Sequence, residues 1–399
     1  MNTLLKATGF LLLAIVFSCS DSPQESDENL AIPVTFQRTI NLSELVDTEL
    51  SYIPLQSKEA PLIGEIQKVA FTDSLIYVLD KYHLQTVLIF RGDGSFVGQV
   101  GSVGEGVGEY QYISDFILTE AGIEIADSHS QKVIQYSFAG HYDKEWKVPF
   151  MISEMELAGN NRRWVYSPYD IADTAYNQVL YLLDSTYTTI EQSYFPYENV
   201  IDDAPFPGYM TSYDGHMTYT KPLLGEYYQF NSSNGQKEFE MKVDFEPYGW
   251  PISRKELTSE TEAVEEVFRK GNVMTMSHQL TETEGFITLW TLMRDPDFVS
   301  DDPYDFGDPW LCIYHKKSGK LLAVQNVIND LDDGLFALPI ATHRDQLIGV
   351  LNVERLLEQA EPGSSMQSTS SIAQIMDSLT QESNPVLMRY RLNDGLFDD

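Results

Sequence analysis

The sequence contains a strand-rich unit that repeats at a nearly constant offset. The two clearest copies occupy residues 76–100 and 123–148, and Asp80 in the first recurs as Asp127, 47 residues later, in the second. Each copy has the pattern strand, polar turn, strand, glycine turn, strand. A repeat of about 40 to 50 residues made only of strands is typical of a β-propeller blade. The repeat therefore restricts the fold more strongly than any other feature of the chain.

Strand patterns at a similar spacing continue through the rest of the sequence, and no Pro/Gly/Ser linker interrupts residues 33–350. We therefore predict one all-β domain over residues 33–399, a six-bladed β-propeller of four-stranded antiparallel blades. The last predicted blade lacks an outer strand. We expect the N-terminal segment Val34–Pro54, which contains Ser51–Pro54, to complete that blade and close the ring, which would remove exposed strand edges.

Two short helical insertions are predicted within this domain. The segment Ser253–Lys270 has apolar residues at helical spacing and is followed by Gly271. The segment Ser371–Leu379 places four apolar side chains on one helical face. Both predictions rest on apolar residues that recur every three to four positions, whereas apolar residues recur every two positions in the strands.

The first residues have the composition of a targeting segment. Residues 1–18 contain one lysine followed by the apolar run Gly9–Phe17, and they end before Cys19. The ending Val-Phe-Ser-Cys resembles a bacterial lipobox, which implies that Cys19 is acylated and anchors the chain to a membrane. An ordinary secretion signal is the alternative. Residues 19–32 are polar and acidic, and we predict a flexible tether.

The acidic tether also resembles the export signal of surface lipoproteins in gut Gram-negative bacteria. That resemblance implies an outer-membrane lipoprotein at the cell surface, and a lipoprotein facing the periplasm is the alternative. The formal net charge is −34, from 60 acidic and 26 basic residues. Such a surface repels phosphate backbones, so we expect no nucleic-acid partner. The other cysteine, Cys312, lies in an apolar strand and is interpreted as a buried hydrophobic residue.

The two clearest repeats resemble a known class of propellers. Each contains a V-x-D-like strand end, a polar turn, a V-x-x-F/Y strand and a glycine turn, as in Val78–Asp80 and Val87–Phe90. This pattern resembles the six-bladed NHL/TolB-like propellers. The loop Gly101–Tyr110 is similar to a connection in six-bladed propeller lipoproteins of gut Gram-negative anaerobes. The resemblance implies a fold and a location rather than a reaction.

Motifs for catalysis are not found. The sequence has no HExxH or G-x-S-x-G motif, and the glycines of residues 101–108 are not followed by the Lys-Ser/Thr of a phosphate-binding loop. No two of the seven histidines lie two to four residues apart. We therefore assign no catalytic residue, metal ligand or cofactor. Asp80 and Asp127 are expected to cap the turns that follow them.

The turns between the second and third strands of all blades lie on one face of a propeller, and several of them are long. Long loops on a rigid scaffold commonly carry binding sites. We therefore predict a monomeric binding module for a glycan, a peptide or a partner protein. The alternative is a metal-assisted lyase or hydrolase with its site at the axis. The predicted ligand-binding residues are Lys81, Tyr82, His83, Tyr169, Lys221, Arg294, Tyr304 and Arg355.

Overall fold

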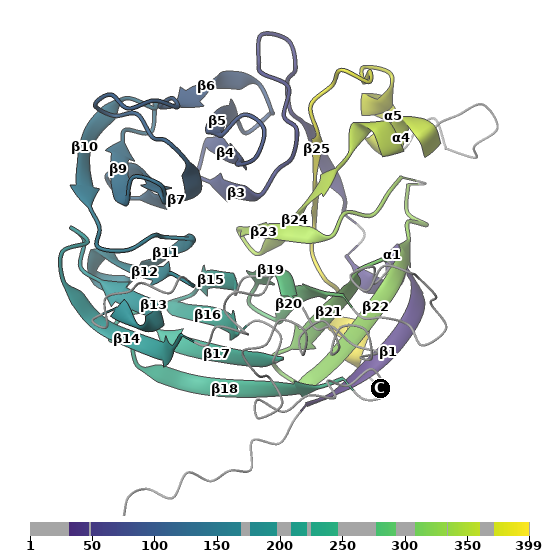
Figure 1. Cartoon of the computed structure of the whole chain (residues 1–399). Coiled ribbons are helices and arrows are strands. Elements are labelled where there is room, and N and C mark those ends of the chain that lie inside the picture. The colour runs from purple at the N-terminus through teal and green to yellow at the C-terminus, as the bar shows by residue number, and fades with distance from the viewer. Residues whose placement is uncertain are drawn as a thin grey trace, which may run out of the picture. The chain divides into compact units, whose positions relative to one another are not determined.

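The fold is described from a computed structural model (Figure 1). The described residues are 32–47, 49–168, 176–197, 209–221, 225–245, 277–292, 308–332, 334–359 and 371–398. The predicted signal and lipidation site at Cys19, nearly all of the predicted tether, and the predicted helix Ser253–Lys270 lie outside these residues.

Four blades are separate four-stranded antiparallel sheets. Apolar, β-branched and aromatic side chains dominate their inner strands, which suits a half-buried pleated surface. The first blade contains β3 (Lys68–Phe71), β4 (Leu75–Asp80), β5 (Thr86–Arg91) and β6 (Phe96–Val100). The second contains β7 (Ile113–Thr119), β8 (Gly122–Asp127), β9 (Lys132–Tyr136) and β10 (Tyr142–Lys147). The third contains β11 (Glu154–Ala158), β12 (Arg162–Tyr166), β13 (Gln178–Leu183) and β14 (Ile190–Pro196). The fourth is β23 (Pro339–His343), β24 (Gln346–Leu351), β25 (Val386–Tyr390) and β2 (Ser51–Pro54).

The remaining strands form one continuous nine-stranded sheet. The prediction of six separate four-stranded blades is therefore wrong, because the structure has four such blades. The nine strands, in spatial order, are β15 (Tyr209–Tyr213), β16 (His216–Lys221), β17 (Glu226–Asn231), β18 (Lys237–Asp244), β1 (Ile32–Asn41), β22 (Lys320–Ile328), β21 (Trp310–His315), β20 (Phe286–Thr291) and β19 (Ser277–Glu282).

Strand β1 is the reason for the difference. It pairs in parallel with β18 through Ile32 and with β22 from Val34 onward. It thereby joins two antiparallel groups, β15–β18 and β19–β22, whose outer edges would otherwise be open (Figure 1). Because β1 pairs with β18 and with β22, it supplies hydrogen-bond partners to both edges. Backbone N–H and C=O groups at these edges would otherwise remain available for pairing with another chain.

The second strand and the last strand of the described chain meet in one blade. β2 pairs antiparallel with β25, with Ser51 opposite Arg389 and Pro54 opposite Val386. The sequence predicts this particular pairing, although it assigns the whole segment from Val34 to the same blade. Each antiparallel group has one end strand, its first strand, that faces the next group. These first strands contact one another in a closed cycle, from β3 to β7, β11, β15, β19 and β23 and back to β3. The arrangement is thus propeller-like.

The repeated aspartates hold equivalent turns. The Oδ1 atom of Asp80 accepts the His83 backbone N–H at 2.9 Å, and its Oδ2 accepts that of Gly64 at 2.7 Å. Asp127 accepts the backbone N–H of Ser130 at 3.0 Å in the same way. Both carboxylates are almost fully buried. The predicted capping of these turns is confirmed, and each aspartate also ties its blade to the segment that precedes it.

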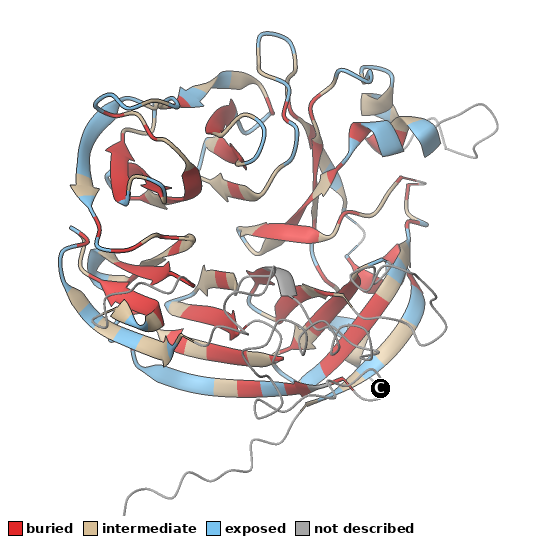
Figure 2. Ribbon diagram, viewed as in Figure 1, coloured by how far each residue is buried: buried red, intermediate tan, exposed pale blue. Residues whose placement is uncertain are grey.

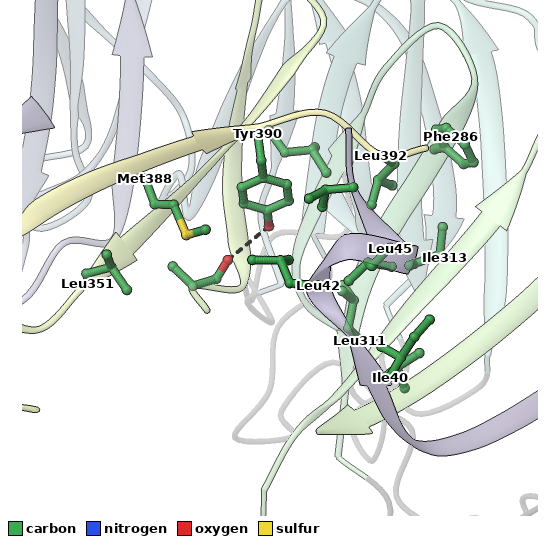
Figure 3. Packing of buried hydrophobic residues seen from close by; sticks show 14 of the residues in the cluster. Ile40, Leu42, Leu45, Phe286, Leu311, Ile313, Leu351, Met388, Tyr390 and Leu392 are labelled. Carbon is green, nitrogen blue, oxygen red and sulfur yellow. Dashed lines mark hydrogen bonds between the residues drawn. The ribbon is translucent and has the colours of Figure 1, made fainter. Parts of the chain in front are cut away.

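The core between the blades is made of buried apolar side chains (Figure 2). In one cluster, Ile40 at the end of β1 and Leu42 and Leu45 of the short helix α1 (Leu42–Leu45) pack between the nine-stranded sheet and the blade that contains β25 (Figure 3). The hydroxyl of Tyr390 in this cluster donates a hydrogen bond to the Ala337 carbonyl at 2.9 Å. The N-terminal segment is therefore part of the core.

Helices are few in the described residues. Besides α1 they are α4 (Val353–Gln359) and α5 (Ser371–Met376), with two 3₁₀ turns at Gly159–Asn161 and Asp394–Phe397. Helix α5 begins where the sequence predicts it and ends earlier. Its buried Ile372 packs into the same cluster as α1.

A buried ion pair joins the second and third blades. Arg163 on β12 donates two hydrogen bonds to the carboxylate of Glu124 on β8, each 2.6 Å long. The Tyr187 hydroxyl donates a third, also 2.6 Å long. The Arg163 and Glu124 side chains are 2% and 1% exposed. These hydrogen bonds fill the acceptor positions of the Glu124 carboxylate. If either Arg163 or Glu124 were removed, the remaining charge would be buried without a counter-charge, which would destabilise the fold.

Candidate functional site

A cavity of about 360 Å³ lies among the first strands of the ring. Residues from β3, β7, β11, β15, β19 and β23 line it, together with the turn after β4. We call it the central cavity. Its volume lies at the lower end of the range of small-ligand pockets. Because the first strands run side by side around it, side chains distant in the sequence face the same space.

Lys68 of β3 is the most connected polar group of the central cavity. Its Nζ lies 2.9 Å from Asp115 Oδ2 and 3.5 Å from Glu156 Oε1. It also donates to the Met155 carbonyl at 3.2 Å. Burial alone would lower the pKa of Lys68, but the carboxylates of Asp115 and Glu156 outweigh burial and raise the pKa. The ammonium group is therefore held charged.

Two glutamates of β11 face the same cavity. Glu154 and Glu156 are two residues apart on one strand, so their side chains lie on one face. Glu156 contacts Lys68, whereas the carboxylate of Glu154 accepts the Met210 backbone N–H at 3.2 Å. Burial raises the pKa of Glu154 to about 8, and the nearby Asp115 carboxylate adds to the rise. Glu154 is therefore mostly protonated at neutral pH.

The turn after β4 supplies the rim of the cavity. The Lys81 backbone N–H donates to Gln67 Oε1 at 2.6 Å, which fixes the start of the turn. The Lys81 Nζ lies 5.7 Å from the centre of the Tyr82 ring. Tyr82 lines the cavity and is still 58% exposed. The turn thus presents an aromatic face and a cation to solvent at the cavity.

The predicted ligand-binding residues are placed as follows. Lys81 and Tyr82 line the central cavity. His83 lies in the same turn, with its ring nitrogen Nδ1 3.7 Å from Asp80 Oδ1. Lys221 is buried, with Nζ 5.6 Å from the Phe195 ring centre. Arg355 is exposed on α4, and neither Lys221 nor Arg355 is among the cavity-lining residues. The predicted residues Tyr169, Arg294 and Tyr304 lie outside the described residues.

Sequence reasoning missed the charged residues of the cavity wall. A signal for them exists, because a charged residue interrupts an apolar first strand in Lys68-Val-Ala-Phe, in Ile-Ser-Asp115-Phe and in Glu154-Met-Glu156-Leu. Charged residues are seldom buried without partners. Each interruption is therefore a candidate for a side chain that faces the ring axis.

Three further features of the described residues complete the picture of the site and its surroundings. Within the described ranges, no three His, Cys, Asp or Glu side chains form a group that could hold a metal ion. No helix in the described part of the chain is long and apolar enough to cross a membrane. Cys312 is buried, and burial raises the pKa of its thiol to about 12, so it remains a neutral thiol.

Together the fold and the central cavity define a propeller-like all-β protein with a charged cavity inside its ring. Residues 29–391 match a family described as "Domain of unknown function (DUF4934)", and the chain belongs to this family. Comparison with curated proteins finds no relative of significant similarity.

Two solved structures are similar to this chain, and the first of them supports the fold. A "Putative exported protein" from Bacteroides fragilis NCTC 9343 is 18% identical with a TM-score of 0.71, and the match covers 91% of this chain and 99% of that one. A member of the duf4221 family from Bacteroides vulgatus is 8% identical with a TM-score of 0.49, and the match covers 88% and 97%. At 18% identity, the first similarity shows a shared fold and not a shared ligand.

Proposed function

We propose that this protein is an exported, lipid-anchored binding module that takes its ligand at the central cavity. The cavity itself carries the proposal, because it combines the charged residues of its wall with an exposed aromatic ring and a lysine at its rim. Export is supported by the lipobox-like sequence before Cys19 and by the name of the similar Bacteroides fragilis protein, and anchoring is supported by the lipobox-like sequence alone. We place the protein at the outer membrane, facing the cell exterior.

The wall chemistry favours a ligand that presents an amine. Lys68 already neutralises Asp115 and contacts Glu156. Among the described residues Glu154 forms no ion pair within 4.0 Å, and burial and Asp115 raise its pKa by more than Lys68 and Lys81 lower it. An entering ammonium group would supply the missing counter-charge, so that Glu154 ionises and releases its proton. Of the ligand classes predicted from the sequence, a peptide end or a lysine side chain fits this requirement best.

Thermal shift assays with the full mature chain test this proposal. The ligands are a library of lysine-free tripeptides with a free amino terminus and the same library with that terminus acetylated. We expect some free tripeptides to raise the melting temperature and their acetylated counterparts to have little effect. Binding should also release a proton at pH 7, which calorimetry in buffers of different ionisation enthalpy measures.

Variants locate the binding. Tyr82→Ala should weaken binding about tenfold, since stacking on an aromatic ring contributes about 1 kcal/mol or more. The matched control is Tyr142→Ala, because Tyr142 is also an exposed tyrosine but lies on β10 and outside the cavity. Equal binding of acetylated tripeptides, or an equal loss in Tyr142→Ala, would refute the proposed site.

A further inference from the structure

A second cavity, of about 390 Å³, lies within the nine-stranded sheet, between β16–β18 and β19–β21. Two rows of side chains form its walls. In the first row Thr218 lies opposite Gln229, and Gln229 lies opposite Phe239. In the second, Glu282 lies opposite Ile287, and Ile287 opposite Tyr314. Residues directly opposite on neighbouring antiparallel strands share a face of the sheet.

The two rows meet at their inner ends. The Thr218 hydroxyl donates to Glu282 Oε2 at 2.9 Å, and Gln229 Nε2 donates to Glu282 Oε1 at 3.4 Å. The space then continues to Phe239, which is 43% exposed, and to the half-buried Tyr314. We call this space the wedge cavity. It has a polar inner end and an aromatic outer end.

Strand β1 contributes to this arrangement. The apolar cluster next to the wedge cavity contains Tyr227, Met241 and Ile287, and side chains of β1 such as Val34 and Phe36 pack against it. The cavity therefore belongs to the place where β1 joins the two antiparallel groups. Without β1, the cluster would lose its contacts with Val34 and Phe36.

Charges at the inner end are already compensated. Lys316 Nζ lies 2.8 Å from Glu282 Oε1, and the same Nζ donates to the Thr283 carbonyl at 2.6 Å. The Glu282 side chain is only 2% exposed. A charged ligand would have to compete with this pair, whereas a neutral ligand would not.

The aromatic rings also disfavour a cationic ligand. Lys316 Nζ lies 4.8 Å from the Tyr213 ring centre, and Lys237 Nζ lies 5.4 Å from that of Tyr228. Each of these rings already interacts with an ammonium group, which a cationic ligand would have to displace, whereas the amine proposed at the central cavity pairs with Glu154 and not with the Tyr82 ring. The carboxylates Asp214 and Glu284 line the same cavity and disfavour an anion.

We propose that the wedge cavity binds a neutral, hydroxyl-rich ring of a carbohydrate. The apolar face of such a ring packs on Phe239 and Tyr314, while its hydroxyl groups exchange hydrogen bonds with the amide of Gln229 and the carboxylates of the rim. Aromatic walls with a few fixed polar groups are the usual composition of a small-ligand pocket. This site is separate from the central cavity, and its occupation does not depend on the function proposed above.

Isothermal titration calorimetry with the full mature chain tests the proposal. The probes are neutral hexasaccharides of glucose, xylose and mannose, with a chitosan hexamer as cationic probe and a galacturonate hexamer as anionic probe. We expect at least one neutral hexasaccharide to bind and the two charged probes to bind at least about tenfold more weakly. The absence of binding by all neutral hexasaccharides, or stronger binding of a charged probe, would overturn the proposal.

Substitutions assign the binding to the wedge cavity. Phe239→Ala should weaken the neutral hexasaccharide about tenfold, as expected for the loss of one stacking ring. Tyr142→Ala is the matched control, because Tyr142 is 42% exposed on β10, the outer strand of its sheet, and does not line the wedge cavity. Gln229→Leu, which removes an amide of similar size, should also weaken binding. Equal losses in Tyr142→Ala and Phe239→Ala would contradict the assignment, and Tyr82→Ala at the central cavity should change nothing.

Discussion

Replacement of Glu154 by glutamine should change how the stability of the protein depends on pH. Burial raises the pKa of this carboxyl group from 4.5 to about 8 in the folded chain. An unfolded chain gives up the proton near its ordinary pKa, so the folded state binds more protons between these two values. The stabilising effect of the raised pKa is fully present below about pH 4.5 and is lost as the pH rises through about 8.

The size of the effect follows from the shift. At 1.36 kcal/mol per pKa unit, the difference between 4.5 and about 8 corresponds to at most about 5 kcal/mol. Glutamine cannot ionise. We therefore expect Glu154→Gln to match the wild type near pH 5 and to exceed it at pH 9 by up to that amount. Asp115, Glu156, Lys68 and Lys81 are present in both proteins, so their titration largely cancels in the comparison.

Urea unfolding at pH 5, 7 and 9 measures the difference, and the fully buried Trp164 and Trp310 provide a fluorescence signal for unfolding. Glu120→Gln is the control, because Glu120 is exposed in the turn between β7 and β8 and loses the same charge. Its stability relative to wild type should be nearly independent of pH. Parallel curves for wild type and Glu154→Gln would refute the reasoning, since they would mean that the carboxyl group titrates alike in the folded and unfolded chains.

Three other outcomes are expected. Glu124→Met should lower the free energy of unfolding by about 3–5 kcal/mol, because it leaves the Arg163 guanidinium buried without a counter-charge. Adding Arg163→Met should restore most of this loss, which a double-mutant cycle followed by urea unfolding would measure. Deletion of residues 20–55 removes β1 and β2 and should lower the melting temperature of the whole domain in one transition, as calorimetry would show. Cys19→Ala should move the protein from the detergent-extracted membrane fraction to the soluble one, whereas an unchanged distribution would exclude lipidation at this residue.

Much of the local structure could be predicted from the sequence. Turn chemistry is encoded within a few residues, so the caps at Asp80 and Asp127 follow from the repeat itself. The pairing of Ser51–Pro54 with the last strand was also predictable, because a blade with one strand missing needs a partner. These features depend on short-range patterns or on one requirement of the ring.

The role of β1 could not be predicted in the same way. Its partners are remote in the sequence, since Ile32 lies opposite Val243 and Val34 lies opposite Leu321. A parallel pairing leaves no hairpin turn in the sequence to reveal it. The strand is half exposed and alternates irregularly, so its pattern is compatible with an edge in any blade. The blade count was therefore wrong at the place where tertiary pairing, and not local pattern, decides the sheet.

The two cavities differ in how their charges are compensated, and this difference separates their functions experimentally. In the central cavity, Glu154 has a raised pKa and needs an incoming cation in order to ionise. In the wedge cavity, Glu282 is already paired with Lys316. Binding of an amine at the first site should therefore be linked to proton release and should strengthen as the pH rises toward 8. Binding of a neutral sugar at the second needs no such charge change. A pH titration of both affinities in one protein should show two different slopes, whereas equal slopes would refute the linkage between amine binding and ionisation of Glu154.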